Sequence, residues 1–175
     1  MEVKLDGLAY RWDGRNWTDP DDGLPPVSLR HRLSQMFAAE INAMDDAISD
    51  PSELTKLAQH AANANDQGRA IKLAKRAFEM DSQNEGRAAT LVSVYRKVHR
   101  SDAAVFILDA FPNTRFGPLL TTLAALLCDL ERWEEAHLKI KRALAINKSG
   151  EAFAVYSRIK KERPDLITKR PDLIG

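Results

Sequence analysis

Apolar residues spaced three or four positions apart dominate the chain after residue 26, and this spacing predicts helices. The first series is Leu29, Leu33, Phe37, Ile41, Met44 and Ile48. It predicts one amphipathic helix of about five turns over residues 27–49, with Ser28 as its N-cap. The next helix is predicted to begin at Pro51, because Asp50 can cap its free amides and proline is tolerated at the first helical position.

The helical pattern then repeats with a nearly constant period. Ala70 and Ala104 are 34 positions apart, and Ala136 follows Ala104 after 32. A period of this length predicts stacked helical hairpins, each of which buries its apolar face against the next. We predict three repeats, at residues 51–84, 85–116 and 117–150, and a closing helix that extends to residue 162. The predicted fold class is therefore all-α, built from tandem helical hairpins.

The repeats resemble the tetratricopeptide repeat (TPR) family, which has large apolar residues on the first helix and small ones where the two helices cross. The residues at these spacings are Leu54, Leu57, Ala58, Ala70 and Ala77 in repeat one, Ala88, Leu91 and Ala104 in repeat two, and Leu120, Ala124, Trp133, Ala136 and Ala143 in repeat three. The resemblance implies a right-handed superhelix. Repeat two departs from the pattern, since Phe111 replaces a small residue and Pro112 ends the helix early, so we expect an altered angle between repeats two and three.

TPR proteins usually bind segments of other proteins along their concave face, and the resemblance implies the same here. The residues expected at that face are Thr55, Gln59, Asn63, Thr90, Ser93, Arg96, Lys97, Thr121 and Ala125. Such small polar side chains suit a peptide backbone, and Arg96 with Lys97 suits one acidic side chain. The alternative is a solvated helix face without a ligand. Some family members clamp a chaperone's terminal carboxylate with charged residues, but Thr55, Gln59, Thr90, Pro118 and Thr122 stand at those positions.

The segment of residues 1–26 differs from the rest of the chain. Asp13-Gly14 between aromatic flanks predicts a short β-hairpin at about residues 8–18, followed by a loop. The stretch around Trp12 and Trp17 resembles a small bacterial domain of unknown function with a Trp-Asp-Gly-x-x-Trp-Thr signature. Paired tryptophans on one face of a hairpin can cover the helix of residues 27–49, or they can contact a partner.

Composition excludes several functional classes. The 26 basic and 25 acidic residues give a net charge of +1, so the chain has no overall field that favours nucleic acid. Cys128 is the single cysteine, the histidines are dispersed, and no motif for phosphate binding or nucleophilic catalysis is present. We expect neither catalysis nor a cofactor nor a metal site. No apolar run is long enough to cross a membrane, and we expect a cytoplasmic adaptor or scaffold.

The C-terminal part is the most basic, and it carries the alternative function. Residues 131–175 hold eleven Lys and Arg against seven acidic residues, whereas residues 1–50 hold five against ten. A basic C-terminal face could bind nucleic acid phosphates. Opposite charges at the two ends also predict self-association. Arg-Pro-Asp-Leu-Ile occurs at residues 163–167 and again at 170–174, and we predict that residues 163–175 form a flexible tail that can serve as a ligand.

Overall fold

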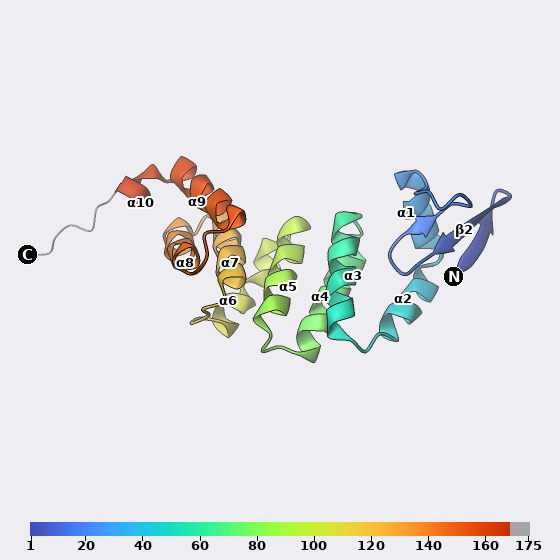
Figure 1. Cartoon of the computed structure of the whole chain (residues 1–175), viewed down its shortest axis with the longest axis horizontal. Coiled ribbons are helices and arrows are strands. Elements are labelled where there is room, and N and C mark those ends of the chain that lie inside the picture. Colours follow the sequence, from blue (N-terminus) through green and yellow to red (C-terminus); the bar gives the residue numbers. More distant parts are fainter. Residues whose placement is uncertain (169–175) are drawn as a thin grey trace, which may run out of the picture. The chain divides into compact units, whose positions relative to one another are not determined.

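The computed structural model of this chain describes residues 1–168, which form two compact units, one over Met1–Ala77 and one that begins at Phe78. The fold is all-α with a small β-sheet at the N-terminus, so the predicted fold class is confirmed (Figure 1). No helix within residues 1–168 combines the length and the apolar character needed to cross a membrane.

The first unit begins with an antiparallel sheet in the order β1 (Glu2–Leu5), β2 (Leu8–Trp12) and β3 (Trp17–Thr18). The predicted hairpin corresponds to β2 and β3, in which Trp12 pairs with Trp17. The Asp13 carboxylate stabilises their turn by accepting hydrogen bonds from the backbone amides of Arg15 and Asn16, both at 2.7 Å. Strand β1 was not predicted. It joins β2 through Asp6-Gly7, two residues with positive φ, as a two-residue hairpin turn requires.

The predicted continuous helix over residues 27–49 is broken into α1 (Val27–Met36) and α2 (Ala38–Asp46). The break occurs at Phe37, whose backbone has φ −111° and ψ 26° and leaves the helical region. This conformation lets the Phe37 ring pack against Trp17, with ring centroids 5.7 Å apart. The prediction of Ser28 as N-cap is also wrong, because α1 begins directly after Pro26 without a side-chain cap.

Helices α3 (Pro51–Asn63) and α4 (Gln67–Met80) form the first helical hairpin. The Asp50 carboxylate accepts a hydrogen bond from the Ser52 amide at 2.8 Å, which confirms Asp50 as the N-cap. Arg76 of α4 donates hydrogen bonds to the backbone carbonyls of Asp45, Asp46 and Ile48 at 2.6 to 3.0 Å. These bonds satisfy carbonyls in the last turn of α2 and just after it, and they fix the connection between α2 and α3.

The second unit contains two further hairpins and a closing helix. Its elements are α5 (Glu85–Lys97), the 3₁₀ turn η1 (Ser101–Ala104), α6 (Phe106–Ala110), α7 (Gly117–Asp129), α8 (Trp133–Ile146), α9 (Gly150–Glu162) and α10 (Pro164–Thr168). The second helix of repeat two is thus split into η1 and the short α6, which ends before Pro112 as predicted. Phe111, the residue after α6, is buried and packs edge-to-face on Phe78, with ring centroids 6.4 Å apart.

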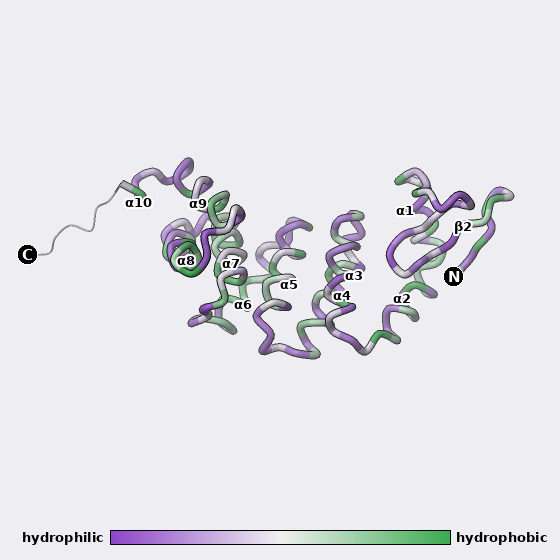
Figure 2. Tube along the Cα trace, in the orientation of Figure 1, coloured by the Kyte–Doolittle hydropathy of each residue, from purple (hydrophilic) through white to green (hydrophobic). Residues whose placement is uncertain are grey.

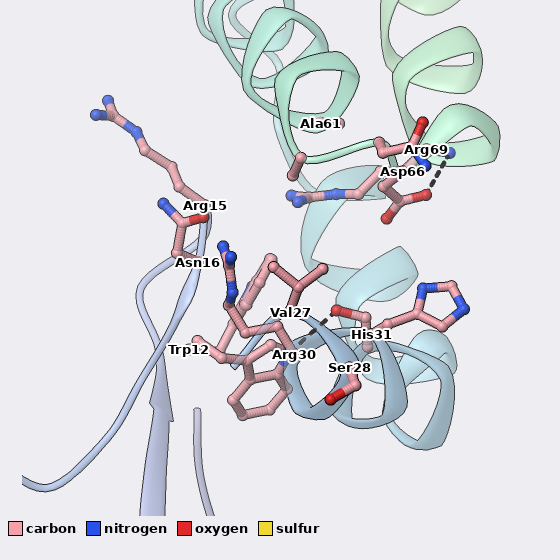
Figure 3. Close-up of a pocket in the computed structure, with 14 residues that line it drawn as sticks. Trp12, Arg15, Asn16, Val27, Ser28, Arg30, His31, Ala61, Asp66 and Arg69 are labelled. Carbon is pink, nitrogen blue, oxygen red and sulfur yellow. Dashed lines mark hydrogen bonds between the residues drawn. The ribbon is translucent and has the colours of Figure 1, made fainter. Parts of the chain in front are cut away.

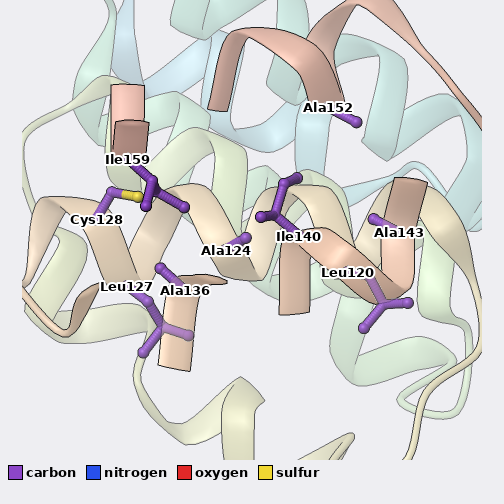
Figure 4. Close-up of a cluster of buried hydrophobic side chains, with 9 residues drawn as sticks. All are labelled: Leu120, Ala124, Leu127, Cys128, Ala136, Ile140, Ala143, Ala152 and Ile159. Atoms are coloured by element: carbon purple, nitrogen blue, oxygen red, sulfur yellow. The ribbon is translucent and has the colours of Figure 1, made fainter. Parts of the chain in front are cut away.

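Helix α7 is the centre of the second unit, and hydrophobic residues extend along most of its length (Figure 2). Its residues Leu120, Ala124 and Leu127 pack against Ala136 and Ile140 of α8 in a buried cluster (Figure 4). The members of this cluster are Leu120, Ala124, Leu127, Cys128, Ala136, Ile140, Ala143, Ala152 and Ile159. Its small residues Ala124, Ala136 and Ala143 are at most 1% exposed, as expected for positions where two helices pack closely.

All three hairpin turns have the same backbone geometry. Asn65, His99 and Glu131 have φ between 57° and 61°, the left-handed conformation. In each turn the next amide donates to a carbonyl five residues earlier; for example, the amide of Arg132 donates to the carbonyl of Leu127 at 2.9 Å. This is the Schellman motif that ends helices. The left-handed residue therefore recurs with the period of the repeats.

The prediction of a flexible tail over residues 163–175 is wrong for its first part. Residues 164–168 form α10, and Leu166 and Ile167 pack against the buried cluster of α7, α8 and α9. The side chain of Arg163 donates to Glu134 and to Asp165, each at 2.9 Å. The first Arg-Pro-Asp-Leu-Ile sequence is thus part of the fold. The second copy lies outside the described residues.

Candidate partner-binding surfaces

We call α5, α7 and α9 the inner helices of the second unit, because the TPR resemblance places helices at these positions of the repeat along the concave face; α7 contacts both of the others. On α5, Thr90 is half-buried, whereas Ser93 and Lys97 are exposed. On α7, Thr122 is half-buried. The hydroxyls of Thr90 and Thr122 donate to backbone carbonyls four residues earlier, at 3.1 and 2.8 Å. Thr90, Ser93, Lys97 and Thr122 are named here the inner face.

Two residues predicted for this surface cannot contact a partner. Thr121 is 7% exposed and its hydroxyl donates to the Gly117 carbonyl at 3.0 Å, while Ala125 is 4% exposed. Both were assigned by counting positions along a regular repeat. They are buried because α7 is packed by α5 on one side and by α8 and α9 on the other.

Arg96 does lie on this side of α5, but its charge is already used within the fold. Its Nε donates to Asp129 Oδ2 at 2.6 Å. Asp129 also accepts from Arg158 Nη1 on α9 at 2.5 Å, and Arg158 lies 5.8 Å from the centroid of the Trp133 ring. Asp129 thus connects three consecutive inner helices. The expectation that Arg96 would bind an acidic side chain of a partner is corrected accordingly, and the Arg96–Asp129–Arg158 network was missed from the sequence.

Burial alone would raise the pKa of Asp129, but hydrogen bonds and positive charge from Arg96 and Arg158 outweigh it and leave the pKa below its ordinary value. Because the pKa of Asp129 is lower in the folded state than in the unfolded state, its ionised form stabilises the fold at any pH above the pKa of the unfolded state. This contribution is lost as the pH falls through the lowered pKa. Asp129 is therefore a residue of structural importance on the inner side of the second unit.

We expect Asp129→Asn to lower the free energy of unfolding by about 1–2 kcal/mol at pH 7, because two guanidinium groups lose their shared carboxylate in a partly exposed site. The difference from the unsubstituted protein should begin to shrink near pH 4, the ordinary pKa of an unfolded Asp, and continue to shrink as the pH falls through the lowered pKa of Asp129 in the folded protein. Urea unfolding at several pH values measures both effects. A difference that stays constant from pH 7 to pH 3 would contradict the role given to the ionised carboxylate.

The predicted residues of repeat one lie on α3 in the first unit. Gln59 and Asn63 are exposed, and Thr55 is half-buried with its hydroxyl donating to the Pro51 carbonyl at 2.7 Å. They form a small polar face on α3. Thr55 and Gln59, like Thr90 on α5, are uncharged at positions where a carboxylate clamp would need a charged or amide side chain.

Trp12 and Trp17 are buried, with exposed fractions of 6% and 1%. Their rings lie 5.4 Å apart, and they form a cluster with Tyr10, Leu33 and Ile41. Trp17 Nε1 donates to the Ser34 hydroxyl at 3.2 Å, which satisfies its polar edge. The sequence left two alternatives for these tryptophans, covering the following helices or contacting a partner. In the structure they are buried between the sheet and helices α1 and α2, so neither ring is exposed on the surface.

Many of the basic side chains near the C-terminus have partners inside the protein. Arg158 pairs with Asp129, Arg163 pairs with Glu134, and Arg142 donates to the Thr114 carbonyl at 2.9 Å. Lys169 and Arg170 lie outside the described residues. Burial raises the pKa of the Cys128 thiol, which is 1% exposed, so this cysteine is a buried apolar residue and not a reactive nucleophile.

Comparison with known proteins connects this architecture to solved TPR domains. Neither a model of a known protein family nor a curated protein sequence matches the chain. The Sgt2 TPR domain from Aspergillus fumigatus is similar over 70% of this chain and 84% of its own, with a TM-score of 0.60 and 12% identity. The first TPR domain of human RPAP3 gives 0.59, with 15% identity, over 69% and 97%. A thermophilic TPR protein of Thermus thermophilus, TTC0263, gives 0.52, with 20% identity, over 81% and 93%.

These similarities define the class of the fold. The chain has the tetratricopeptide-repeat fold, with a three-stranded sheet and two short helices preceding the first repeat. A structure of the first TPR of Spaghetti (RPAP3) contains a bound HSP90 peptide, SRMEEVD; it matches 65% of this chain with a TM-score of 0.56 and 17% identity.

Proposed function

We propose that this protein is a non-catalytic adaptor or scaffold that holds an extended segment of a partner protein on the inner face of its second unit. The observation that carries the proposal is the row of small polar side chains on α5 and α7, Thr90, Ser93 and Thr122, next to the exposed Lys97. Small side chains allow a peptide backbone to approach the helices closely, and hydroxyl groups can hydrogen-bond to it. A cytoplasmic location belongs to the same proposal.

The fold supports this proposal, because solved TPR domains include one with a bound peptide. The ligand of that domain is not transferred to this chain. Recognition of its acidic terminus by charge would require free basic side chains, but Arg96 is paired with Asp129, and the Thr90 and Thr122 hydroxyls are the groups at the neighbouring positions. We therefore propose a partner segment with small or polar side chains, which need not end in a carboxylate.

We expect Ser93→Tyr to abolish partner capture, because a large ring on the inner face occupies the space that a peptide backbone needs. Ser93 is exposed, so the substitution should change the free energy of unfolding by less than about 0.5 kcal/mol. Affinity purification followed by mass spectrometry identifies the captured partner. Titration of the purified partner against the unsubstituted protein and against Ser93→Tyr then measures the loss of affinity.

The matched control is Ala145→Tyr, which places the same ring at an exposed position on α8, an outer helix. It should leave capture unchanged. If Ser93→Tyr binds the partner as tightly as Ala145→Tyr does, the inner face is not the binding surface. If nucleic acid is recovered instead and its binding weakens steeply with salt, the basic C-terminal face becomes the better explanation.

A further inference from the structure

The first unit contains a pocket of about 480 Å³, and none of the inner-face residues lines it. It lies between the turn after β2, helix α1 and the α3–α4 turn (Figure 3). Its apolar lining includes the indoles of Trp12 and Trp17 together with Val27 and Ala61. Its basic lining consists of Arg15, Arg30 and Arg69.

The three arginines differ in how their charges are used. Arg69 is held inside the fold: Nε and Nη2 donate to the two oxygens of Asp45, each at 2.8 Å, Nη2 also donates to the Gly14 carbonyl, and the guanidinium lies 4.9 Å from the centroid of the Trp12 ring. It forms a fixed wall of the pocket. Arg30 extends from α1 toward the turn that carries Arg15 and Asn16 (Figure 3), and its Nε is buried without an acceptor among residues 1–168.

A buried donor without an acceptor costs free energy, and a ligand that supplies the acceptor recovers it. The one carboxylate in the lining, Asp66, is used at the start of α4, where it accepts a hydrogen bond from the Arg69 amide at 3.2 Å. Because Asp45 neutralises Arg69, the charges of Arg15 and Arg30 exceed that of Asp66. The pocket therefore favours an anion that has an apolar neighbour.

The exposure of the lining indicates the source of that anion. Arg15, Val27, His31 and Asn65 lie at the rim, and all four are exposed, so a small molecule would stay largely open to solvent. Small-molecule sites usually enclose most of their ligand, whereas a protein partner can insert one side chain and cover the rim itself. A carboxylate of a protein is thus a better fit than a free metabolite.

We propose that this pocket binds an acidic side chain of a partner protein, flanked by an apolar residue, with the carboxylate accepting hydrogen bonds from Arg30 and the apolar residue lying against the exposed Val27, beside the largely buried Trp12 ring. Charge-assisted bonds between guanidinium and carboxylate are among the strongest in proteins. This site goes beyond the proposed function, because it lies in the first unit and would act independently of the inner face.

The test uses the full ¹⁵N-labelled chain and two blocked peptides, acetyl-Leu-Glu-Leu-amide and acetyl-Leu-Gln-Leu-amide. The Glu peptide should shift the indole N–H signals of Trp12 and Trp17 in NMR spectra and leave that of Trp133 in the second unit unchanged. The Gln peptide should bind at least about tenfold more weakly. Arg30→Gln should weaken binding of the Glu peptide by a similar factor, whereas Arg32→Gln, an exposed site on the same helix outside the pocket, should not.

The Trp17 indole N–H donates to Ser34, so an unchanged chemical shift of its signal in Arg30→Gln shows that the variant has folded. Arg15→Gln, at the rim, is a second variant, and we expect it to weaken the affinity for the Glu peptide by about twofold to threefold. Equal binding of the two peptides, or unchanged binding by Arg30→Gln, would overturn the proposal. So would tighter binding of inorganic phosphate than of the Glu peptide, because the site would then recognise phosphate. Ser93→Tyr should leave this binding intact, which separates the two proposals.

Discussion

Asp45→Ala should destabilise the first unit by about 3–5 kcal/mol, because it leaves the Arg69 charge without its partner in a buried site. The side chains of Asp45 and Arg69 are 3% and 8% exposed, and two hydrogen bonds of 2.8 Å join them. Arg69 also holds the β2–β3 turn through the Gly14 carbonyl and lies over Trp12. Loss of Asp45 should therefore loosen the sheet as well as α2. Amide hydrogen exchange, followed residue by residue in residues 1–77, measures this loss of protection.

Asp46→Ala is the matched control for this effect. Asp46 is the next residue and also forms an ion pair, with Lys72 at 2.9 Å, but its side chain is 60% exposed. Exposed pairs contribute about 0–1 kcal/mol, so protection should hardly change. Equal effects of the two substitutions would mean that burial of the Asp45–Arg69 pair is not what makes it important.

Leu127→Ala should have the largest effect in the second unit, with a loss of about 2–5 kcal/mol in the free energy of unfolding. Leu127 is completely buried and lies in the cluster that joins α7, α8 and α9 (Figure 4). Removing its branched end leaves a cavity among neighbours that several helices hold in place, so the site can collapse only partly. A urea titration followed by circular dichroism gives the shift in the unfolding midpoint.

Leu138→Ala makes the same chemical change on α8 at a residue that is 65% exposed. The expected change is within about 0.5 kcal/mol, because no cavity forms. A loss at position 138 as large as that at position 127 would show that the cluster in Figure 4 does not determine the stability of this unit.

The repeats were predictable because their signal is local and recurs. Ala70, Ala104 and Ala136 mark the positions where two helices cross, and each hairpin repeats the same spacing of apolar residues. The end of α6 followed from Pro112 alone, and the β2–β3 hairpin from Asp13-Gly14. Strand β1 could have been found by the same signal, because Leu5-Asp6-Gly7-Leu8 contains the same turn dipeptide.

The remaining features depend on contacts between residues far apart in sequence. Phe37 fits a helical spacing perfectly, and only its contact with Trp17 explains why the helix breaks there. Arg96 looks available to a partner in the sequence, yet Asp129, 33 residues later, forms an ion pair with it. Asp45 and Arg69 are separated by 24 residues. In each case the pattern of polar and apolar residues shows the face on which a side chain lies, but it does not show which group meets it.

The three hairpin turns show where the stability of this protein could be increased by substitution. Asn65, His99 and Glu131 all adopt a backbone conformation that side chains with a Cβ disfavour by about 1 kcal/mol or more. Glycine adopts it freely, and asparagine tolerates it better than most residues. The chain therefore keeps an unused reserve of stability at His99 and Glu131, two exposed positions where a single exchange to glycine would relax the backbone without disturbing the packing of either helix.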